Sequence, residues 1–546
     1  MPPLQWVQNY APIAGSAVWS AAVAGLPLLV VALLLGVWRA PAWKAAIFSL
    51  ATALAVAIFA YGMPVPLAIA ATGYGAAYGL FPIGWLVYSA ILLFDVTVEA
   101  GCFEAIKHSL RRVSGDQRLL VLLIAFCFGA FIEGTSGFGT PVAVSASLLA
   151  GLGLPAFTAA ALCLVANTAP VAFGALATPI VGLAGVTALP IASLSAAVGR
   201  LSPLVAVFIP MYLMVLMAGW SGAVAVWPAA AACGISFAIT QFLVSNFVGP
   251  YLTDIISAFA SAVVLLIMIG WWKPAAGSKF EMKAAETADP HTGWGSILRA
   301  WTPYILLVIL VVIWGTDAGA KLLGGPTLRF NVPSLHNAVI LTYPVKATNT
   351  PYAAVFTFNW LASAGTATFL AAFIAALLTG VSIGRFLSLM VGTLKRLIVP
   401  ELTFAAVVAL AYIMNYSGAT ATLGLLLART GVLFPFFSAF LGWLGVFLTG
   451  SDTSANLLFG NLQVISARTL GLNPVLMAAV NSTAGTLGKM VSLQSIAVAT
   501  AATGMARDNE AKLFLFTLRH SIGLTVVMGV IALLFAYVFA GAMPTV

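Results

Sequence analysis

The chain has 546 residues, of which 62% are hydrophobic and 7% charged, and its formal net charge is +9. A mean hydropathy of +1.09 excludes a soluble or disordered chain and indicates a polytopic membrane protein, with the lipid bilayer as its surroundings. The positive charge does not indicate a nucleic-acid partner, because lysine and arginine gather in short loops, where they set membrane topology.

Apolar runs long enough to cross a bilayer follow one another along the chain. Residues 64–99 are too long for one crossing and are interrupted by Gly73, Gly75, Gly79 and Pro82, so they form two spans or a bent pair. At about 20 apolar residues per crossing, the sequence predicts an all-α membrane protein of about 12–14 transmembrane helices. The other runs lie roughly at 16–38, 43–62, 119–133, 142–165, 203–219, 223–247, 252–272, 301–315, 354–379, 398–414, 432–449 and 520–541.

A hydrophilic stretch at residues 272–298 divides the chain into two membrane halves of similar length, 1–271 and 299–546. We predict that this linker is cytoplasmic, because loops rich in lysine and arginine face the cytoplasm. The segment from Gly315 to Pro351 is poor in charge and rich in Pro, Asn and Thr, and we predict that it faces outside. The other predicted cytoplasmic loops contain Arg39 with Lys44, Lys107 to Arg118, and Arg385 to Arg396.

Each half contains one polar, glycine-rich stretch, at residues 131–180 and 449–500. In each stretch seven residues separate an asparagine from a glycine, and four more separate that glycine from a hydroxyl residue. Such an internal repeat is typical of secondary transporters, so we expect two related halves with discontinuous helices. The aligned pairs are Asn167 with Asn481, Gly174 with Gly488, and Thr178 with Ser492.

Glycine and hydroxyl residues let a membrane helix stop, which leaves backbone N–H groups free at the start of the next half-helix. Such a terminus carries about half a positive charge and binds carboxylates. The alternative is that these small residues only let helices pack closely, but the same stretches also contain Glu133, Asp452 and Lys489. This combination favours a site for a small organic anion in the middle of the membrane.

Lys489 stands in an apolar and hydroxylated segment, so it needs a partner, either an anionic substrate or Asp452. Burial disfavours the charged form of a carboxyl group, so Glu133 or Asp452 could carry a coupling proton. Asp254 and Glu401 are weaker candidates for this role, since helix capping or an interfacial position explains them equally well. No cofactor or metal ion is predicted, because the four histidines and four cysteines lack metal-binding spacing.

Four runs resemble the bacterial lactate permease family: Glu133 to Val144, Ala166 to Leu176, Thr449 to Asn456, and Gly488 to Ala499. The resemblance covers nearly the whole chain. It implies proton-coupled uptake of L-lactate, and often of D-lactate and glycolate, across the bacterial inner membrane.

The resemblance also implies where the site residues lie. Thr135 to Gly137 and Asp452 to Ser454 would form the tips of re-entrant hairpins, and Asn167-Thr168 and Asn481 to Thr483 would fall in the discontinuous helices. The chain departs from the family pattern at Thr135, Thr140, Tyr251 and Leu493, and the last of these replaces an expected proline, which weakens the case for a sharp second break. The predicted substrate-binding residues are Thr135, Ser136, Gly137, Asn167, Thr168, Ser451, Thr453, Ser454, Asn481, Ser482, Thr483, Lys489, Ser492 and Gln494.

The hypothesis is a symporter in which a proton on Glu133 or Asp452 and a carboxylate against Lys489 leave the loaded site neutral. An enzyme is not predicted, because Gly134 to Phe138 lacks the last glycine of a nucleophile turn and Gly485 to Met490 lacks a complete phosphate-binding loop. A passive anion channel and a sodium-coupled carboxylate carrier are the alternatives, since helix breaks also line pores and hold sodium. The sequence favours no oligomeric state.

Overall fold

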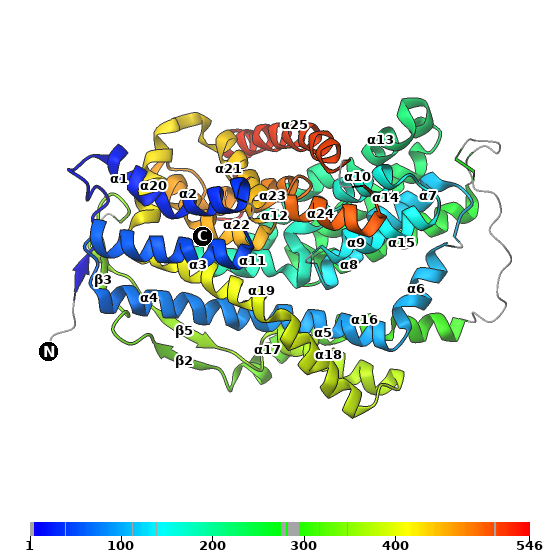
Figure 1. Cartoon of the computed structure of the whole chain (residues 1–546), viewed down its shortest axis with the longest axis horizontal. Helices are drawn as coiled ribbons and strands as arrows, with labels where there is room; N and C mark the ends of the chain where they lie inside the picture. Colours follow the sequence, from blue (N-terminus) through cyan, green and yellow to red (C-terminus); the bar gives the residue numbers. More distant parts are fainter. Residues whose placement is uncertain are drawn as a thin grey trace.

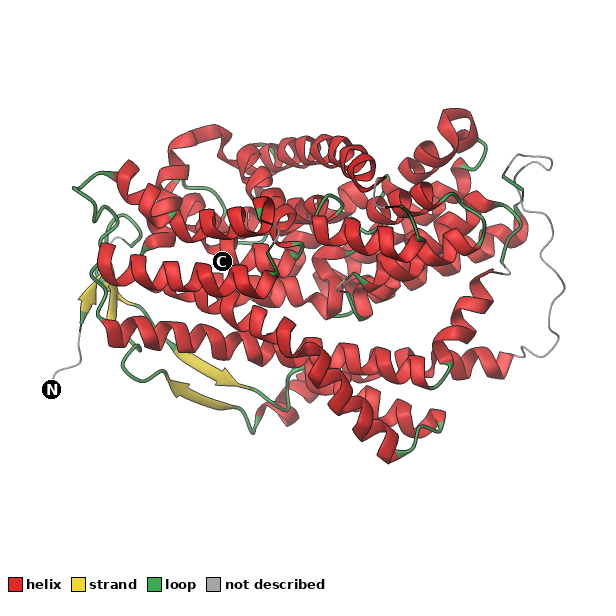
Figure 2. Ribbon diagram, viewed as in Figure 1, coloured by secondary structure: helices red, strands yellow, loops and turns green. Residues whose placement is uncertain are grey.

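The computed structural model describes residues 5–545 apart from 39, 112, 138, 273, 275–279, 282–293, 316, 347 and 507–508. The described chain is almost entirely helical, as predicted, and Figures 1 and 2 show the helices packed together with a small strand region near the N-terminal end. The helices before the linker are α1 (Ala17–Ala24), α2 (Leu26–Ala32), η1 (Leu33–Val37), α3 (Ala42–Ala55), η2 (Val56–Ala60), α4 (Val65–Tyr78), η3 (Gly79–Gly84), α5 (Trp85–Glu99), α6 (Cys102–Arg111), α7 (Gln117–Val121), η4 (Leu122–Phe128), α8 (Gly129–Thr135), α9 (Thr140–Gly151), α10 (Ala156–Ala166), η5 (Val171–Phe173), α11 (Gly174–Thr187), α12 (Ile191–Ala206), α13 (Ile209–Val224), α14 (Trp227–Phe247) and α15 (Thr253–Trp271).

The second half continues the same all-helical pattern. Its helices are α16 (Trp294–Gly315), α17 (Asp317–Gly324), α18 (Ala364–Thr379), α19 (Ile383–Ser417), α20 (Ala419–Leu427), η6 (Ala428–Leu433), α21 (Phe434–Thr449), α22 (Asp452–Thr469), α23 (Pro474–Lys489), α24 (Leu493–Thr503), α25 (Glu510–Tyr537) and η8 (Ala540–Ala542). Most of the predicted linker at 272–298 lies outside the described residues, and α16 begins within its range at Trp294.

Nine helices of the described chain are long and apolar enough to cross a membrane, or eleven if each of two bent pairs is one span. The predicted number is larger because residues 64–99 form one helical unit, and because the predicted runs at 301–315 and 354–379 form helices shorter than a full span. Three shorter apolar helices, Thr140–Gly151, Leu298–Trp314 and Ala364–Thr379, add to the membrane-embedded part.

The ambiguous segment at residues 64–99 is one bent helical unit of 35 residues, Val65–Glu99. The bend lies at Phe81, whose φ of −143° and ψ of 123° are not helical. It directly precedes Pro82, which has no N–H to continue the helix. Of the two predicted alternatives, the structure therefore shows the bent unit.

Five short strands depart from the all-α prediction, and most lie in the segment that the sequence predicts to be an external loop. Backbone outside helices must still pair its polar groups, and here it does so in two small sheets. The strands are β1 (Trp6–Val7), β2 (Leu328–Asn331), β3 (Val339–Leu341), β4 (Thr350–Pro351) and β5 (Val355–Phe358). β1 runs parallel to β3, β4 is antiparallel to β3, and β2 is antiparallel to β5 with Leu328 opposite Phe358.

The helices pack into two groups, and each group contains helices from both halves of the sequence. The first, which we name the α19 group, contains α3, α4, α5, α18 and α19. The second, the hairpin group, contains α8 to α11 and α21 to α24. In Figure 1 much of the hairpin group lies above α4, α5 and α18. Because each group draws on both halves, the site between them is completed only by the whole chain.

Candidate functional site

Two helical hairpins turn back inside the protein. The first reverses at the tip that the family resemblance implies, and the second reverses just before its expected tip, because Asp452 to Ser454 form the first turn of α22. α8 ends at Thr135 and α9 begins at Thr140, and between them Gly137 and Gly139 have positive φ angles of 59° and 83°. In the second hairpin α21 ends at Thr449, and Gly450, with φ of 72°, reverses the chain. Glycine adopts these left-handed angles without the steric penalty of a side chain.

Each hairpin is followed by a broken helix. α10 and the segment Val171–Thr187, which contains α11, are bent by 63° around residues 167–170, where the sequence predicts a break at Asn167-Thr168. The second break lies between Lys489 and Leu493, so Asn481, Ser482 and Thr483 lie inside the continuous helix α23, where we had expected them at the discontinuity. The break forms without a proline because Ser492 caps α24 by accepting a hydrogen bond from the N–H of Ser495.

Two aligned hydroxyl residues of the predicted repeat have similar places in the backbone. Ala175, Leu176 and Ala177, at the start of α11, have φ angles of 45°, 55° and 60°, so its regular right-handed part begins at Thr178. The aligned residue Ser492 is the N-cap of α24. The two aligned hydroxyl residues thus both stand where a half-helix begins.

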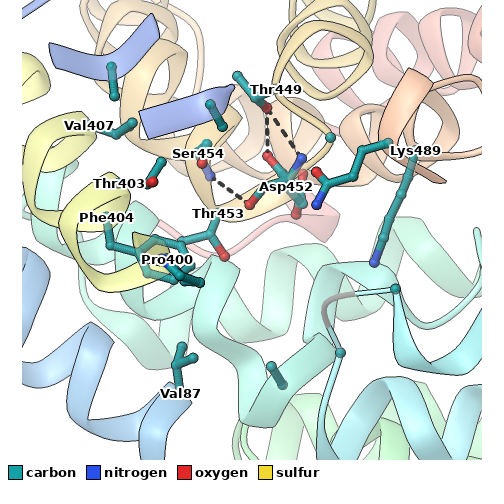
Figure 3. A pocket seen from close by; sticks show the side chains of 18 of the residues that line it. Val87, Pro400, Thr403, Phe404, Val407, Thr449, Asp452, Thr453, Ser454 and Lys489 are labelled. Carbon is teal, nitrogen blue, oxygen red and sulfur yellow. Dashed lines mark hydrogen bonds between the residues drawn. The ribbon is translucent and has the colours of Figure 1, made fainter. Parts of the chain in front are cut away.

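A cavity of about 450 Å³ lies between the hairpin tips and the α19 group. Figure 3 shows Thr403 and Phe404 of α19 near Thr453 and Ser454 of α22, with Lys489 on the other side of the pocket. The apolar wall from α3, α5 and α19 was missed by the sequence analysis, because ordinary apolar residues of a membrane helix do not stand out. The predicted residues that line the cavity are Glu133, Gly137, Ser451, Asp452, Thr453, Ser454, Lys489 and Gln494.

Glu133 and Lys489 form a buried ion pair across the two halves of the chain. Lys489 Nζ donates to Glu133 Oε1 at 2.7 Å, and the side chains are 9% and 4% exposed, respectively. Asn167 Nδ2 donates to the other oxygen, Glu133 Oε2, at 2.9 Å. Gly174 makes room for this carboxylate, since a Cβ there would lie 2.5 Å from Oε1. The partner of Lys489 is therefore Glu133, and not Asp452 as one prediction proposed.

Asp452 lies in the same cavity at the start of a buried hydrogen-bond network. Its Oδ2 accepts from Ser482 Oγ at 2.7 Å, while its Oδ1 has no hydrogen-bond partner among the described residues. A Cβ on Gly485 would overlap Oδ1, so this glycine admits the carboxylate between α22 and α23. Asn456 Nδ2 donates to Ser482 Oγ at 3.0 Å. The sequence analysis missed Asn456, although its place four residues after Asp452 puts both on one helix face.

The network continues away from the cavity along α22 and α23. Asn481 Nδ2 donates to Asn456 Oδ1 at 2.8 Å, and Gln463 Nε2 donates to Asn481 Oδ1 at 2.7 Å. Ser438 Oγ of α21 donates to Gln463 Oε1 and is the last member of this hydrogen-bond network. Asn481 and Ser482 thus hold Asp452 in place from behind and do not line the cavity.

Several other predicted residues also lie outside the cavity lining. Thr135 and Ser136 donate to carbonyl groups of their own helix, at Phe131 and Ile132. Thr168 and Thr483 do the same in α10 and α23, and Ser492 contacts Ser495. Glu401 packs against Gly84 beside the cavity wall. The predicted residues that do not line the cavity are Thr135, Ser136, Asn167, Thr168, Asn481, Ser482, Thr483, Ser492, Asp254 and Glu401.

Comparison with known proteins decides the family. A family model described as L-lactate permease matches residues 20–539. The chain belongs to the L-lactate permease family. This family member is therefore a transporter and not an enzyme, and it is a multi-pass membrane protein.

Two bacterial relatives match this family member along almost their whole length. The L-lactate permease of Bacillus subtilis (strain 168) is 42% identical over 569 residues, which cover 99% of this chain and 100% of the relative. The glycolate permease GlcA of Escherichia coli (strain K12) is 44% identical over 98% of this chain and 99% of its own. Among solved structures, MtrF of Neisseria gonorrhoeae, from a class of antimetabolite efflux pumps, matches with a TM-score of 0.45 and 13% identity over 87% of this chain and 85% of that chain.

Proposed function

We propose that the protein is a proton-coupled symporter that brings L-lactate and related short 2-hydroxy monocarboxylates, D-lactate and glycolate, into the cell across the bacterial inner membrane. The observation that carries this proposal is the buried Glu133–Lys489 pair in a cavity between two hairpin tips. The names of the relatives, which are L-lactate and glycolate permeases, supply the substrate class.

The ion pair gives a physical link between proton and substrate. In the empty site Lys489 is neutralised by Glu133, so an incoming carboxylate has no free cation to bind. A proton on Glu133 breaks the pair, and the substrate carboxylate then takes its place at Lys489. The empty and the loaded pair are both neutral, which avoids moving a net charge through the membrane interior.

The half-helix starts contribute to the same site. Ser451, Thr453 and Ser454 line the cavity at the beginning of α22, and Gln494 lines it at the beginning of α24. Both helix starts direct N–H groups and positive dipole ends toward this region. In this proposal the hydroxyl and amide groups bind the 2-hydroxyl group, and Lys489 binds the carboxylate.

The test is uptake of labelled L-lactate by proteoliposomes with an inward proton gradient, with and without a protonophore. We expect accumulation that the protonophore abolishes and that replacing sodium with choline leaves unchanged. The Lys489→Met variant should lose roughly tenfold or more of this uptake. Lys512→Met, which changes an exposed lysine of α25, should not. Equilibration without accumulation would instead indicate a passive anion channel.

A sodium-coupled carrier is the second candidate, and one observation favours it. Asp452 Oδ1 is buried and unpaired among the described residues, and cavity-lining hydroxyl groups of Thr453 and Ser454 follow it on α22. Carboxylate and hydroxyl oxygens are suitable ligands for a hard cation. Lactate accumulation that requires sodium and survives the protonophore would establish this alternative and reject proton coupling.

A further inference from the structure

We propose that Asp254 is a second proton-binding residue of the transport cycle, and that its proton holds the helix break beside Glu133 in the conformation seen. This inference rests on the proposed symport function. Asp254 does not line the cavity, but in this proposal it positions Glu133, which does.

Asp254 lies in the first turn of α15 and is 1% exposed. Neither of its oxygens accepts a hydrogen bond from any residue that the structure describes. No side chain caps α15, so Asp254 is not a capping residue, which was one of the explanations that the sequence left open. A buried ionised carboxylate without donors is strongly disfavoured, whereas the neutral acid needs only one acceptor for its O–H.

Gln241 of α14 supplies that acceptor. This side chain is fully buried, and its Nε2 donates to the carbonyl oxygen of Ala169 at 3.3 Å. Its other end, Oε1, has no partner among the described residues, and the amide lies beside the Asp254 carboxyl group. Because the Ala169 carbonyl fixes the amide nitrogen on its own side, an acceptor faces Asp254. With the amide in this orientation, a protonated Asp254 satisfies both groups.

Ala169 connects this pair to the functional site. It lies in the break between α10 and α11, two residues after Asn167, whose Nδ2 donates to Glu133 Oε2 at 2.9 Å. A second connection runs through Gly134, the neighbour of Glu133, because a Cβ there would lie 2.9 Å from Asp254 Cβ. The last turn of α8 therefore rests directly on Asp254.

Loss of the proton would rearrange this contact chain. An ionised Asp254 requires the N–H of Gln241, so the amide must turn and present Oε1 to the Ala169 carbonyl. Two acceptors then face each other, and the break that holds Asn167 against Glu133 loosens. The charged groups of the site that act on Asp254 are Glu133 and Lys489.

The test is the Asp254→Asn variant, in which the amide donates to Gln241 as the acid does but cannot release a proton. In proteoliposomes we expect the ratio of proton-driven L-lactate accumulation to lactate exchange to fall roughly tenfold or more. The pH dependence of exchange should also become flatter. The control is Ser257→Ala one turn along α15, whose hydroxyl donates only to the carbonyl of Thr253 at 2.6 Å, and which should change neither quantity.

Two outcomes would overturn the inference: an Asp254→Asn variant that accumulates lactate like the wild type, or one that is folded and loses exchange and accumulation in equal proportion. If the variant is not recovered in folded form, infrared spectra of the Asp452→Asn protein labelled with ¹³C-aspartate decide the question. A protonated aspartate band at neutral pH supports the inference, and its absence rejects it. A wild-type protein that shows no proton-driven accumulation would reject the proposed function, while the infrared result would still decide the protonation of Asp254.

Discussion

At the scale of single residues, the Glu133–Lys489 pair determines what the cavity can bind. Each partner is buried, and removing one member of a buried pair typically costs about 3–5 kcal/mol because the other charge is left uncompensated. Glu133 and a substrate carboxylate compete for the same ammonium group. The strength of this competition sets the substrate affinity at any given pH.

Glu133→Gln keeps the size of the side chain but removes its charge, and it should make the substrate the best available partner of Lys489. We expect a folded but less stable protein whose melting temperature rises more on adding L-lactate than that of the wild type. Its lactate affinity should be about tenfold higher and nearly independent of pH, which corresponds to about 1.4 kcal/mol. Thermal shift and binding measurements between pH 5 and 8 check this. Unchanged pH dependence would show that another group carries the proton.

Gly485 is a residue whose importance follows from what lies next to it. An added methyl group would overlap Asp452 Oδ1 and lie 2.9 Å from Val446 Cγ2. Gly485→Ala should therefore lower the free energy of unfolding by about 1–3 kcal/mol and impair transport. Gly523→Ala in α25 is the control, because nothing lies within 4 Å of the new methyl group and the helix gains about 0.5–1 kcal/mol. Denaturation and uptake assays should separate the two variants.

At the scale of elements, the first turn of α11 is the most unusual segment beside the site. Three successive non-glycine residues, Ala175 to Ala177, adopt left-handed backbone angles. This conformation costs roughly 1–2 kcal/mol per residue. Packing must supply this energy, because all three residues are buried and Ala175 also lines the cavity. A segment held in this way is suited to change conformation when its neighbours move.

Ala175→Gly should relieve part of this strain. We expect the conformation seen here to gain up to about 1 kcal/mol, because glycine tolerates a positive φ. Ala184→Gly, in the regular part of the same helix, should have the opposite sign and cost about 0.5–1 kcal/mol. Melting temperatures of the two purified variants test the pair, and two shifts of equal sign would contradict the assignment of strain to the first turn.

At the scale of the whole molecule, the cavity is an interface between the hairpin group and the α19 group. The hairpin group contributes the charged residues and most of the hydroxyl residues. The α19 group contributes a mainly apolar wall that includes Thr403, Phe404 and Val407. Separating polar binding groups from an apolar wall suits a mechanism in which one group moves past the other. Exposed ion pairs such as Arg385 with Glu99 also join α19 to α5 within the α19 group.

Joining the two groups should stop transport. We predict that a bifunctional thiol reagent that bridges Thr403→Cys and Ser454→Cys will reduce lactate exchange roughly tenfold, with recovery after the bridge is cleaved. The native Cys102, Cys127, Cys163 and Cys233 are buried, so they should react little. The two single variants treated in the same way are the controls. Normal exchange by the bridged protein would show that α19 and α22 keep their relative position during transport.

Sequence patterns predicted the helices and tips better than the side-chain contacts. The positions of glycine and hydroxyl residues in residues 131–180 and 449–500 predicted breaks in the helices, because those residues are needed locally wherever the chain reverses. The hairpin tips were implied by the family resemblance. The pairing of Lys489 with Glu133 joins residues 356 positions apart, so no local pattern encodes it. Asn167 and Ser482 were expected to contact substrate, but they orient Glu133 and Asp452 instead. The same types of polar residue either bind a ligand or orient the side chain that binds it, so residue type alone does not distinguish the two roles.

The distance between Glu133 and Lys489 along the chain also affects how the protein is made. At roughly 5–20 residues per second, synthesis of the 356 residues between them takes on the order of 20 to 70 s. During this time the first hairpin is already in the membrane, and its carboxylate has no cation. Until Lys489 has been added, the Glu133 carboxylate lacks the ammonium group that neutralises it in the folded protein. A message truncated before codon 489 would yield a membrane protein with an uncompensated acid, which cellular quality control can recognise and degrade.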